Sequence, residues 1–527
     1  MLMPCLKASI TLAMPKLRAI CLLAPLISLV SACSGGGADS FTVSVSSGPG
    51  GSHMSASSIA VRSGATTSFT LTSSSGYEIA SISGCGGQLS GTTYFTGPVT
   101  NNCTVTASFR LKRYNVLANA SASGSITPAI VAVEHGTTAE FSVIPGADAV
   151  VAGVSGCGGA LTGSRYTTGP ITAECSINAT FARPELLMQG ISSPWGIAEL
   201  PDGRLMITER VGMLVITNAA RTAVEARIKT PLAIDVEGQG GLLDVALDPD
   251  FNSDPKIYIT YTEAGNGAEA GLFGTAVARA RFTANTLNDF EVIYRQVPKV
   301  GGGVHFGSRV VFRSDKTMFV TFGDRGNGGF VQNVGSSIGK VIRIARDGSF
   351  PANNPVIAGG RPEIWSIGHR NSQGAALRPG SDELWLNEHG PQGGDELNRI
   401  VAGGNYGWPN VSYGCNYGDP IGAACRIGGG VHAPTYLEPV SYWVPTSVAP
   451  AGLVFYTGTR FASWQGHAFM GTLAGTALWR VELNGNVEAA RERLFGSLGE
   501  RIRDVHQGND GYLYFVTDSG KLFRIRD

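Results

Sequence analysis

The chain has 527 residues, too many for one ordinary domain, which predicts two or three domains. Its 40 basic and 40 acidic residues give a formal net charge of zero, so charge gives no reason to expect nucleic acid or an anionic membrane surface as a partner. The 72 glycines follow no collagen-like period, and few long helical patterns accompany them. This composition indicates an all-β protein with many tight turns.

The N-terminal segment has the features of a secretory signal. Lys16 and Arg18 precede a short apolar run, which ends in Val30-Ser31-Ala32-Cys33. The run is too short to span a bilayer, and small residues before the cleavage point are typical of a signal peptide. The last four residues also resemble a bacterial lipobox, in which Cys33 would become the lipidated first residue. An ordinary signal peptide with an incidental cysteine is the alternative.

We therefore expect residues 1–33 to be a lipoprotein signal and 34–40 to be a short flexible tether. Such a protein is exported and held by its lipid alone at the outer membrane, facing the periplasm or the cell surface.

Cysteine usage agrees with export. Three of the nine cysteines, Cys5, Cys21 and Cys33, fall in the leader, and the other six form local pairs: Cys85 with Cys103, Cys157 with Cys175, and Cys415 with Cys425. An even number of cysteines in an exported chain predicts disulfides. Zinc is the competing interpretation, but no Cys-x-x-Cys motif or clustered histidine accompanies these pairs.

Residues 41–183 contain an internal duplication. The segment SGCGGQLSGTTYFTGPVTNNCTVTASF ends at Phe109, and the similar segment SGCGGALTGSRYTTGPITAECSINATF ends at Phe181, 72 residues later. A constant offset through many positions means two copies of one unit. Apolar and polar residues alternate in each copy, so we expect two small, disulfide-stapled β-sandwich-like repeats over 41–111 and 112–183. No titratable residues cluster there, which favours a stalk or adhesion role.

The composition changes at Pro184. From there to Asp527, short apolar strands such as GRLMITER, TMFVTFGD and YLYFVTD end in polar or acidic turns. Short strands at regular spacing predict a sandwich or a propeller. Six blades would average roughly 57 residues, longer than propeller repeats of about 40 to 50 residues, which leaves room for functional loops. We predict a β-propeller over 184–527.

Polar residues stand where several of these strands end. His305 lies in the glycine-rich segment GGGVHFG, and histidine is the commonest proton acceptor, although a lone histidine is more often structural. Asp324 in FGDRG lies one strand-length downstream and could return to orient the histidine ring. Arg370 and Asn371 in GHRN combine a cation and an amide suited to a polarised carbonyl oxygen, with a surface salt bridge as the alternative.

Arg501 and Arg503 are two residues apart in a predicted strand, so their side chains share one face. Two neighbouring guanidinium groups repel each other unless an anion lies between them, and Asp504 points to the opposite face. A planar ligand with several carboxylates would satisfy both groups.

The segment from Asn387 to Pro409, NEHGPQGGDELNRIVAGGNYGWP, is rich in oxygen donors, including Glu388, Asp395 and Glu396. Calcium takes six to eight oxygen ligands, which such a loop can supply, although the spacing is not that of an EF-hand. A turn-rich surface loop is the alternative.

Eight motifs occur in order: GQGGLLDVALDPDF, HFGSRVVF, FVTFGDRG, GHRNSQG, NEHGPQGGDELN, GGNYGWP, WVPTSVAPAGLVFY and RIRDV. This series resembles the soluble glucose and aldose sugar dehydrogenases that depend on pyrroloquinoline quinone (PQQ), over nearly all of 184–527. The resemblance implies a six-bladed propeller that uses PQQ and calcium. It also implies oxidation of aldose sugars at the anomeric carbon to lactones, with hydride transfer to PQQ and electrons passed to an external acceptor.

The same resemblance implies roles for individual residues. His305 corresponds to the catalytic base, Asp324 to its carboxylate partner, and Arg370 to the cation that stabilises charge on the quinone oxygen. The implied cofactor contacts are Gln239, Arg370, Asn371, Tyr417, Thr472, Leu473, Ala474, Arg501 and Arg503. The implied calcium ligands are the carbonyls of Gly390 and Pro391 and, at a further site, Glu396 and Tyr406.

One departure from the family pattern stands at Ala474, where the family usually has a lysine that contacts PQQ. Loss of one charge-assisted contact of about 1.5–3 kcal/mol would weaken cofactor binding roughly tenfold to hundredfold. A non-catalytic extracellular binding propeller is therefore the second hypothesis, since the missing lysine and the adhesion-like repeats fit it. A calcium-dependent hydrolase has less support, because no Ser-His-Asp order or close carboxylate pair is present. The sequence leaves the oligomeric state, the physiological sugar and the acceptor open.

Overall fold

The computed structural model describes residues 39–527, and the elements there are β-strands joined by turns and short 3₁₀ helices. The 3₁₀ helices are η1 (Gly267–Glu269), η2 (Gly328–Phe330), η3 (Ala423–Cys425), η4 (Ile427–Gly429), η5 (Ala462–Trp464) and η6 (Gly496–Leu498). No helix in 39–527 has the length and apolar character needed to cross a membrane. The expected all-β fold is confirmed, whereas the expected signal peptide, Cys33 and most of the tether lie outside the described residues.

The first repeat consists of two four-stranded sheets. One has the order β3-β1-β8-β5: β3 (Ser58–Arg62), β1 (Ser40–Ser47), β8 (Cys103–Leu111) and β5 (Tyr77–Ser83). The other has the order β2-β4-β7-β6: β2 (Gly51–Met54), β4 (Ser68–Ser73), β7 (Thr93–Phe95) and β6 (Gln88–Ser90). Val43, Phe69 and Tyr94 are fully buried in the core of this repeat, and the Cys85–Cys103 disulfide joins β8 to the turn after β5.

The second repeat has the same plan. Its sheets are formed by β11 (Ile130–Glu134), β9 (Arg113–Ala120), β16 (Cys175–Gln189) and β13 (Val150–Gly156), and by β10 (Gly124–Thr127), β12 (Glu140–Pro145), β15 (Arg165–Thr167) and β14 (Ala160–Thr162). Cys157 and Cys175 form its disulfide. The hydroxyl of Tyr166 donates to the Gly156 carbonyl at 2.6 Å, as that of Tyr94 does to the Gly84 carbonyl at 2.6 Å in the first repeat. The duplicated sandwich and both predicted disulfides are thus confirmed.

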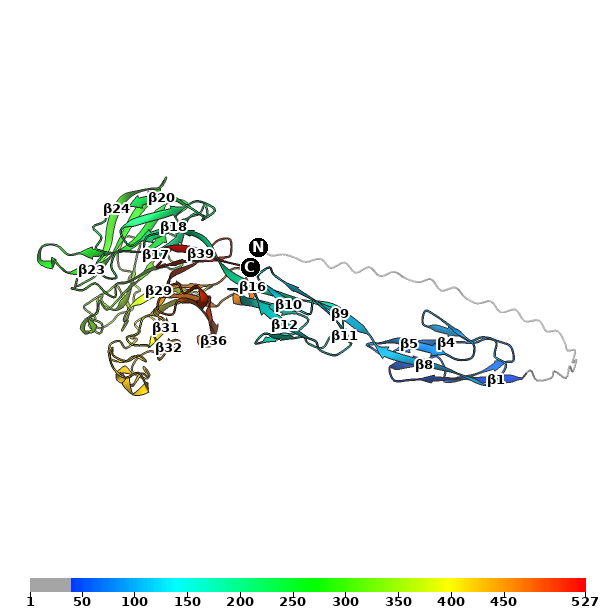
Figure 1. Cartoon of the computed structure of the whole chain (residues 1–527). Coiled ribbons are helices and arrows are strands. Elements are labelled where there is room, and N and C mark those ends of the chain that lie inside the picture. Colours follow the sequence, from blue (N-terminus) through cyan, green and yellow to red (C-terminus); the bar gives the residue numbers. More distant parts are fainter. Residues whose placement is uncertain (1–38) are drawn as a thin grey trace, which may run out of the picture. The chain divides into compact units, whose positions relative to one another are not determined.

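Five four-stranded sheets follow, and a sixth blade belongs to a seven-stranded sheet that continues into the second repeat, which gives the six blades expected for the propeller. The propeller lies at the C-terminal end of the chain in Figure 1. The first three blades are β17 (Pro194–Glu199), β18 (Leu205–Glu209), β19 (Met213–Thr217) and β20 (Val224–Lys229); β21 (Leu242–Leu247), β22 (Lys256–Ala264), β23 (Phe273–Thr283) and β24 (Thr286–Arg295); and β25 (Gly307–Phe312), β26 (Met318–Phe322), β27 (Lys340–Ile344) and β28 (Ile364–Ile367).

The fourth and fifth blades are β29 (Ser372–Leu377), β30 (Leu384–Glu388), β31 (Asp395–Arg399) and β32 (Ser441–Trp443); and β33 (Pro450–Phe455), β34 (Ala468–Thr472), β35 (Ala477–Asn484) and β36 (Val487–Leu494). The sixth blade is β37 (Ile502–Gln507), β38 (Leu513–Thr517), β39 (Lys521–Arg526) and the end of β16. The first strands of the blades, β17, β21, β25, β29, β33 and β37, contact one another in turn and close the ring.

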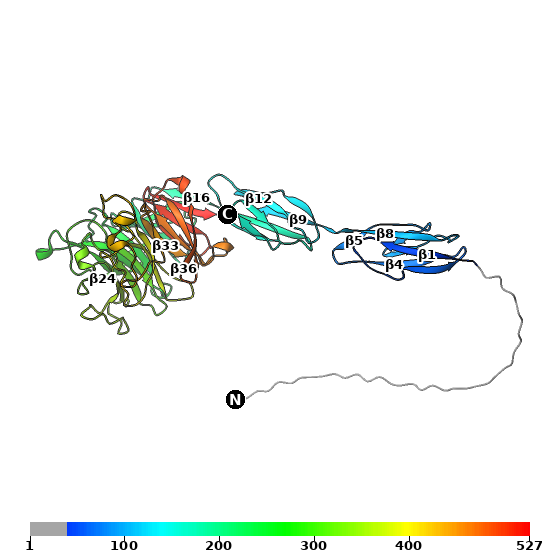
Figure 2. The same cartoon turned by 90° about the horizontal axis from the view of Figure 1, so that it is seen from below.

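Strand β16 belongs both to the second repeat and to the propeller (Figures 1 and 2). Its C-terminal part pairs with β39 from Arg183↔Arg526 to Gln189↔Lys521, so the strand that enters the ring also closes it. The expected domain boundary at 183/184 therefore lies inside one unbroken strand. Ala152 and Ala182 of the repeat share a buried cluster with Trp464 of the fifth blade, so repeat and propeller pack as one unit.

A buried arginine links the blades at the centre of the ring. Arg309 of β25 forms ion pairs with Asp244 of β21 at 3.0 Å and with Asp504 of β37 at 2.9 Å. Its Nε donates to the Gln373 carbonyl of β29 at 2.7 Å, and its guanidinium lies 4.3 Å from the ring centroid of Trp195 in β17. One cation thus fixes five blades relative to one another.

Candidate functional site

His305 and Asp324 are brought together by the hairpin β25–β26. Gly307 pairs with Phe322 at the open end of this hairpin, and the two residues lie just beyond that pair. Nδ1 of His305 lies 2.7 Å from Oδ1 of Asp324. The sequence predicted one strand between His305 and Asp324. The structure instead has two strands joined by a tight turn, and this hairpin is what brings the two residues together.

Three donors surround the Asp324 carboxylate. Besides His305, the indole Nε1 of Trp408 donates to Oδ2 at 2.7 Å and the Gly326 amide donates to Oδ1 at 2.7 Å. Burial alone would raise the pKa of Asp324, but the His305 hydrogen bond and the nearby Arg370 charge lower that pKa below its usual range. Asp324 is therefore an anion that holds the histidine ring through Nδ1 and leaves Nε2 free to accept a proton.

The backbone at His305 is also held in place. Its φ of 54° lies in the left-handed region, which is uncommon for a residue other than glycine. The His305 amide donates to Oε1 of Gln239 at 2.9 Å. A Cβ at Gly323 would lie 2.0 Å from the His305 carbonyl oxygen, so only glycine fits beneath this turn. The ring is therefore positioned before any ligand binds.

Arg370 and Asn371 follow β28. The Arg370 amide donates to Glu388 at 2.6 Å, and its guanidinium lies 5.3 Å from the Trp408 ring centroid. Its Nε is buried and has no hydrogen-bond partner within residues 39–527. Asn371 is fully buried, and its Oδ1 accepts from the Gly307 amide at 3.3 Å. Arg370 thus keeps a buried N–H donor that no atom of the described residues satisfies.

Arg501 and Arg503 line a cavity of about 240 Å³. The other lining residues are Trp195, Arg210, Gln239, Gln373, His389, Ala449 and Leu473. The two arginines share Asp518, at 2.8 Å and 2.9 Å. This corrects the expectation that they lack a protein counter-ion: Asp518 follows β38, whose pairing with β37 brings it between them.

The cavity nevertheless keeps an excess of positive charge. Arg210 donates to the carbonyls of Gly240 at 2.8 Å and 2.6 Å and of Gly238 at 2.5 Å, and forms no ion pair within the described chain. Three guanidinium groups therefore face one carboxylate, Asp518, a formal surplus of two positive charges.

His389 connects this cavity to Arg370. Burial, followed by the nearby charges of Arg370, Arg503 and His305, lowers the pKa of His389 to about 3. It is therefore neutral, with Nε2 donating to the Pro450 carbonyl at 2.9 Å and Nδ1 3.4 Å from the Asn371 amide nitrogen. The predicted base and the predicted cations consequently surround one region.

The turn after β34 contains the expected contacts Thr472, Leu473 and Ala474. Only Leu473 lines the cavity. The Thr472 hydroxyl is used within its own hairpin, where it donates to the Ala477 carbonyl at 2.8 Å, and Ala474 is exposed. Tyr417 is 73% exposed, and its hydroxyl lies 3.5 Å from Nη2 of Arg370. These positions leave Leu473 and Tyr417 near the site and place the other two side chains outside the cavity lining.

The expected calcium loop is held by Asp395. Its carboxylate accepts from the Gly390 amide at 2.9 Å and from the amide of Val448 at 2.5 Å and that of Ala449 at 2.8 Å. The next residue is Glu396, whose pKa is raised well above its usual value by burial and by the negative charge of Glu388.

The donor set here fits a cation only in part. Asn398 donates to both Glu388 and Glu396 at 3.0 Å, and no lysine or arginine of residues 39–527 forms an ion pair with either glutamate. The Tyr406 hydroxyl donates to the Arg399 carbonyl at 2.5 Å and accepts from the Val401 amide at 2.9 Å, so only its carbonyl remains as a ligand. No group of three or more His, Cys, Asp or Glu side chains in 39–527 could hold a metal.

Cys415 and Cys425 form the third predicted disulfide, which closes the loop that carries Tyr417. Oε1 of Gln392 accepts from the Gly418 amide at 3.1 Å, and the backbones of Gln392 and Cys415 also pair. The disulfide loop is thus tied to the Gly390–Gly394 turn.

Residues 191–524 match the profile of the family described as "Glucose / Sorbosone dehydrogenase". The chain belongs to this family. Aldose sugar dehydrogenase YliI of Escherichia coli (strain K12) is 39% identical over 364 residues, which cover 67% of this chain and 96% of the relative.

Two solved structures of glucose / sorbosone dehydrogenase relatives align with the propeller. The soluble aldose sugar dehydrogenase of Escherichia coli in the apo-form has a TM-score of 0.60 at 37% identity, over 65% of this chain and 99% of its own. The PQQ-bound aldose sugar dehydrogenase of Streptomyces coelicolor has a TM-score of 0.54 at 27% identity, over 66% and 98%. Most of both repeats lies outside the family match.

Sequence reasoning missed several residues of this glucose / sorbosone dehydrogenase site: Trp195, Arg210, Gln373, His389, Trp408 and Asp518. Arg210 and Asp518 end short apolar strands, the signal that singled out Asp324, and could have been found by it. Trp195 carries no comparable signal, since a tryptophan within an apolar strand is ordinarily core.

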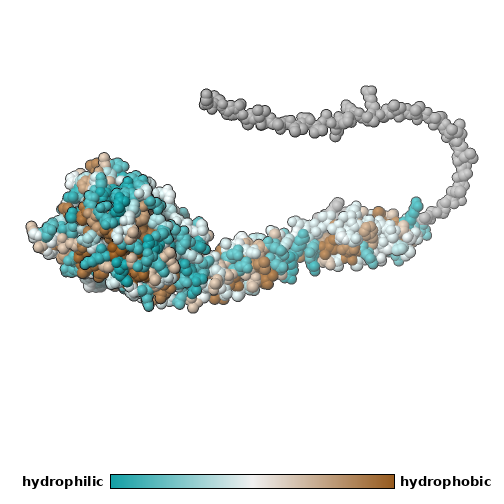
Figure 3. Space-filling view, turned by 90° about the horizontal axis from the view of Figure 1, so that it is seen from above, coloured by the Kyte–Doolittle hydropathy of each residue, from teal (hydrophilic) through white to brown (hydrophobic). Residues whose placement is uncertain are grey.

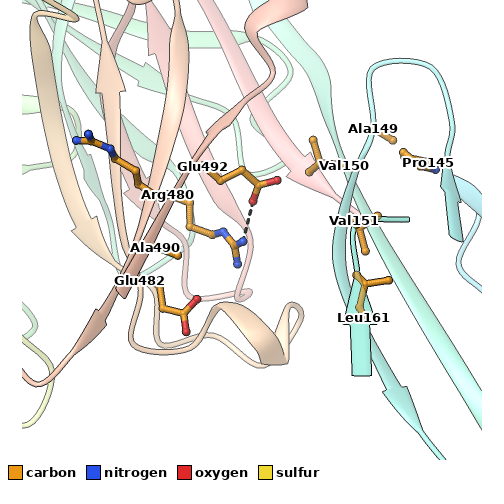
Figure 4. Close-up of a pocket in the computed structure, with 11 residues that line it drawn as sticks. Pro145, Ala149, Val150, Val151, Leu161, Arg480, Glu482, Ala490 and Glu492 are labelled. Carbon is orange, nitrogen blue, oxygen red and sulfur yellow. Dashed lines mark hydrogen bonds and ion pairs between the residues drawn. The ribbon is translucent and has the colours of Figure 1, made fainter. Parts of the chain in front are cut away.

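A second cavity, of about 460 Å³, lies where the second repeat meets the fifth blade (Figure 4). Val150, Val151 and Leu161 form an apolar wall, and Arg480 on the facing wall pairs with Glu492 at 2.7 Å. Glu482 also lines this cavity and forms no ion pair within residues 39–527, but no histidine lies in the lining, unlike in the first cavity. The face of the propeller in Figure 3 mixes hydrophilic and hydrophobic residues.

Proposed function

We propose that the chain is a PQQ-dependent dehydrogenase that oxidises aldose sugars at the anomeric carbon to lactones, with hydride transfer to PQQ and electrons passed to an external acceptor. The observation that carries the proposal is the convergence of an Asp-oriented histidine and a cavity with surplus positive charge on one region of the ring. A base beside an anion-binding cavity is what sugar oxidation with an anionic quinone requires.

The residues present fit PQQ. The cofactor is flat and carries several carboxylates, and the lining of the cavity contains three arginines and no acidic side chain of the described chain. Arg501 and Arg503 would bind carboxylates, and Gln239, Asn371, Leu473 and Tyr417 would supply further contacts. Arg370, whose guanidinium lies beside the His389 carbonyl at 3.2 Å and the Tyr417 hydroxyl at 3.5 Å, would donate to the quinone oxygen. When bound, PQQ supplies a two-electron acceptor for hydride from the sugar.

The chain's own residues then perform the proton chemistry. Nε2 of His305 accepts the proton of the sugar's anomeric hydroxyl, because Nδ1 is held by Asp324. The anionic Asp324 stabilises the resulting imidazolium, as a buried carboxylate does for an oriented histidine base. The guanidinium of Arg370 stabilises negative charge on oxygen. His389, being neutral, supports Asn371 and takes no proton.

Calcium is part of this proposal. The carbonyls of Gly390 and Pro391 would hold the cofactor's ion, and Glu396 with the carbonyl of Tyr406 would contribute to a further site. Glu388 and Glu396 are buried close together, and neither has a lysine or arginine partner in 39–527. Burial and the charge of Glu388 raise the pKa of Glu396, and a bound cation would offset that repulsion, which supports a cation site there. Chelation of calcium from the reconstituted protein should lower both activity and melting temperature, and added calcium should restore both.

Reconstitution tests the function directly. Purified protein would be loaded with calcium and PQQ, and dye reduction would be followed with glucose and other aldoses. We expect turnover with several sugars, whereas the rival binding propeller requires no turnover and no PQQ-dependent thermal shift. His305→Ala should keep the PQQ-dependent shift and lose nearly all turnover. His135→Ala, in the second repeat, is the matched control and should behave as wild type.

We also propose the domain division 1–33, 34–40, 41–111, 112–183 and 184–527, with export and a lipid on Cys33. The absence of titratable clusters from the repeats supports a stalk role. Metabolic labelling with a fatty acid tests the anchor: wild type should carry label, and Cys33→Ser should not.

A further inference from the structure

Arg210 stands at the end of β18, in the turn to β19, and its side chain lines the cavity with Arg501 and Arg503. Within residues 39–527 its guanidinium donates only to main-chain carbonyls, those of Gly238 and Gly240. These bonds fix the group in space without neutralising it.

The charges around Arg210 are unfavourable in the ligand-free protein. Burial, followed by the positive charge of Arg503, lowers the pKa of Arg210, and the smaller effect of the Asp518 charge opposes this. Asp518 already pairs with Arg501 and Arg503. An arginine keeps its proton in such a position, so the cavity keeps a cation for which no carboxylate of residues 39–527 lines the wall.

The turn after β34 lacks the cation that the family pattern places there. Leu473 faces the cavity, and the exposed Ala474 ends in a methyl group. The turn beside the cavity therefore lacks the expected cation at Ala474, whereas the lining holds Arg210, a cation with no ion pair in residues 39–527.

We propose that Arg210 is a binding residue for the anionic cofactor and supplies the charge that Ala474 lacks. This inference rests on the proposed function, since it takes PQQ as the ligand. A bound carboxylate would complete the hydrogen bonds of a fixed guanidinium and offset its repulsion from Arg503.

Arg210 also has a structural role, because Gly238 and Gly240 flank Gln239, which accepts from the His305 amide. Two substitutions separate the roles. Arg210→Lys keeps the charge and loses part of the hydrogen bonding, whereas Arg210→Gln keeps a donor and loses the charge. A charge role predicts that the lysine variant binds PQQ better than the glutamine variant; a purely structural role predicts no such order.

The test is the dissociation constant of PQQ for the calcium-loaded full chain, measured by titration at low and high salt. We expect Arg210→Gln to weaken binding roughly tenfold to hundredfold, Arg210→Lys to weaken it about threefold, and the loss to shrink at high salt. Arg62→Gln, on an exposed strand of the first repeat, removes the same charge elsewhere and should leave affinity unchanged.

The Ala474→Lys substitution provides a second, reciprocal test of the same inference. Ala474→Lys should restore most of the affinity lost in Arg210→Gln and improve wild type by a smaller factor. If Arg210→Gln fails to fold, Ala474→Lys in wild type still decides: a gain of about threefold or less supports the inference, and a larger gain overturns it. Equal affinity of wild type and Arg210→Gln also overturns it. Failure of wild type to bind PQQ would instead overturn the proposed function.

Discussion

Asp324→Asn is the sharpest test of the proposed base, because it changes one oxygen to an NH₂ group without changing shape. Oδ1 accepts from His305 Nδ1 and the Gly326 amide, and Oδ2 accepts from the Trp408 indole, each at 2.7 Å. An asparagine has one acceptor oxygen, so either orientation places an NH₂ donor against another donor.

The two orientations have different consequences. With the oxygen toward His305, the Trp408 bond is lost and a charge-assisted bond becomes neutral, a difference of about 1–1.5 kcal/mol or roughly tenfold in rate. With the NH₂ group toward His305, Nδ1 must accept and Nε2 carries the proton, so the general-base contribution of about 10²–10⁴-fold is lost.

We therefore expect kcat of the reconstituted Asp324→Asn variant to fall at least about tenfold, with PQQ affinity little changed. Stopped-flow dye reduction at saturating sugar measures the rate. Asp347→Asn, an exposed turn residue of the same blade, is the control and should retain the wild-type rate. A folded Asp324→Asn variant within twofold of wild type would refute the assignment of Asp324 and weaken that of His305.

Three further substitutions test the structure. Lys340 donates to three main-chain carbonyls, and burial lowers its pKa to about 7. Between about pH 7 and about pH 10 the folded state therefore binds up to one proton fewer than the unfolded chain, whereas below about pH 7 both states keep the proton. In thermal melts, the unfolding free energy of wild type should rise relative to that of Lys340→Met between about pH 7 and about pH 9, by up to about 1.4 kcal/mol per pH unit. A difference that stays the same across this pH range would contradict the prediction. Replacing both Cys415 and Cys425 by serine should lower the unfolding free energy by about 2–3 kcal/mol. Reductant should then lower the unfolding free energy of this variant less than that of wild type, because only the two disulfides of the repeats remain to be reduced. Gly452 has a φ of 33°, and a Cβ there would lie 2.4 Å from Oδ1 of Asp504. Gly452→Ala should therefore lower the unfolding free energy measured in denaturant titrations by about 1–3 kcal/mol. An unchanged unfolding free energy would mean that the inner strands shift freely.

Local patterns in the sequence were sufficient for much of the architecture. Three patterns reflect short-range constraints: the constant offset between the repeats, the cysteine pairs, and the regular alternation of short strands and turns. The structure agrees with all three. The shared face of Arg501 and Arg503 followed from strand periodicity alone, and both side chains do line one cavity.

The site contacts that the sequence did not predict depend on strand register and on contacts between blades. Asp518 forms ion pairs with both arginines because Ile502 pairs with Thr517, and no local pattern specifies that register. Arg210 comes from the first blade and meets Arg503 of the sixth only because the ring closes. Thr472 was expected to contact the cofactor, yet its hydroxyl donates to the Ala477 carbonyl in its own hairpin. The sequence does not determine whether that hydroxyl bonds to the cofactor or to the main chain.

Strand β16 has a mechanical consequence. A pull applied through the second repeat would act along the axis of the strand whose pairing with β39 seals the propeller. The ladder from Arg183↔Arg526 to Gln189↔Lys521 would then be loaded in shear, with its hydrogen bonds sharing the force rather than opening one by one. Tension on the second repeat and opening of the ring are therefore coupled, so under the proposed N-terminal anchor the β16–β39 pairing would carry the load that keeps the ring closed.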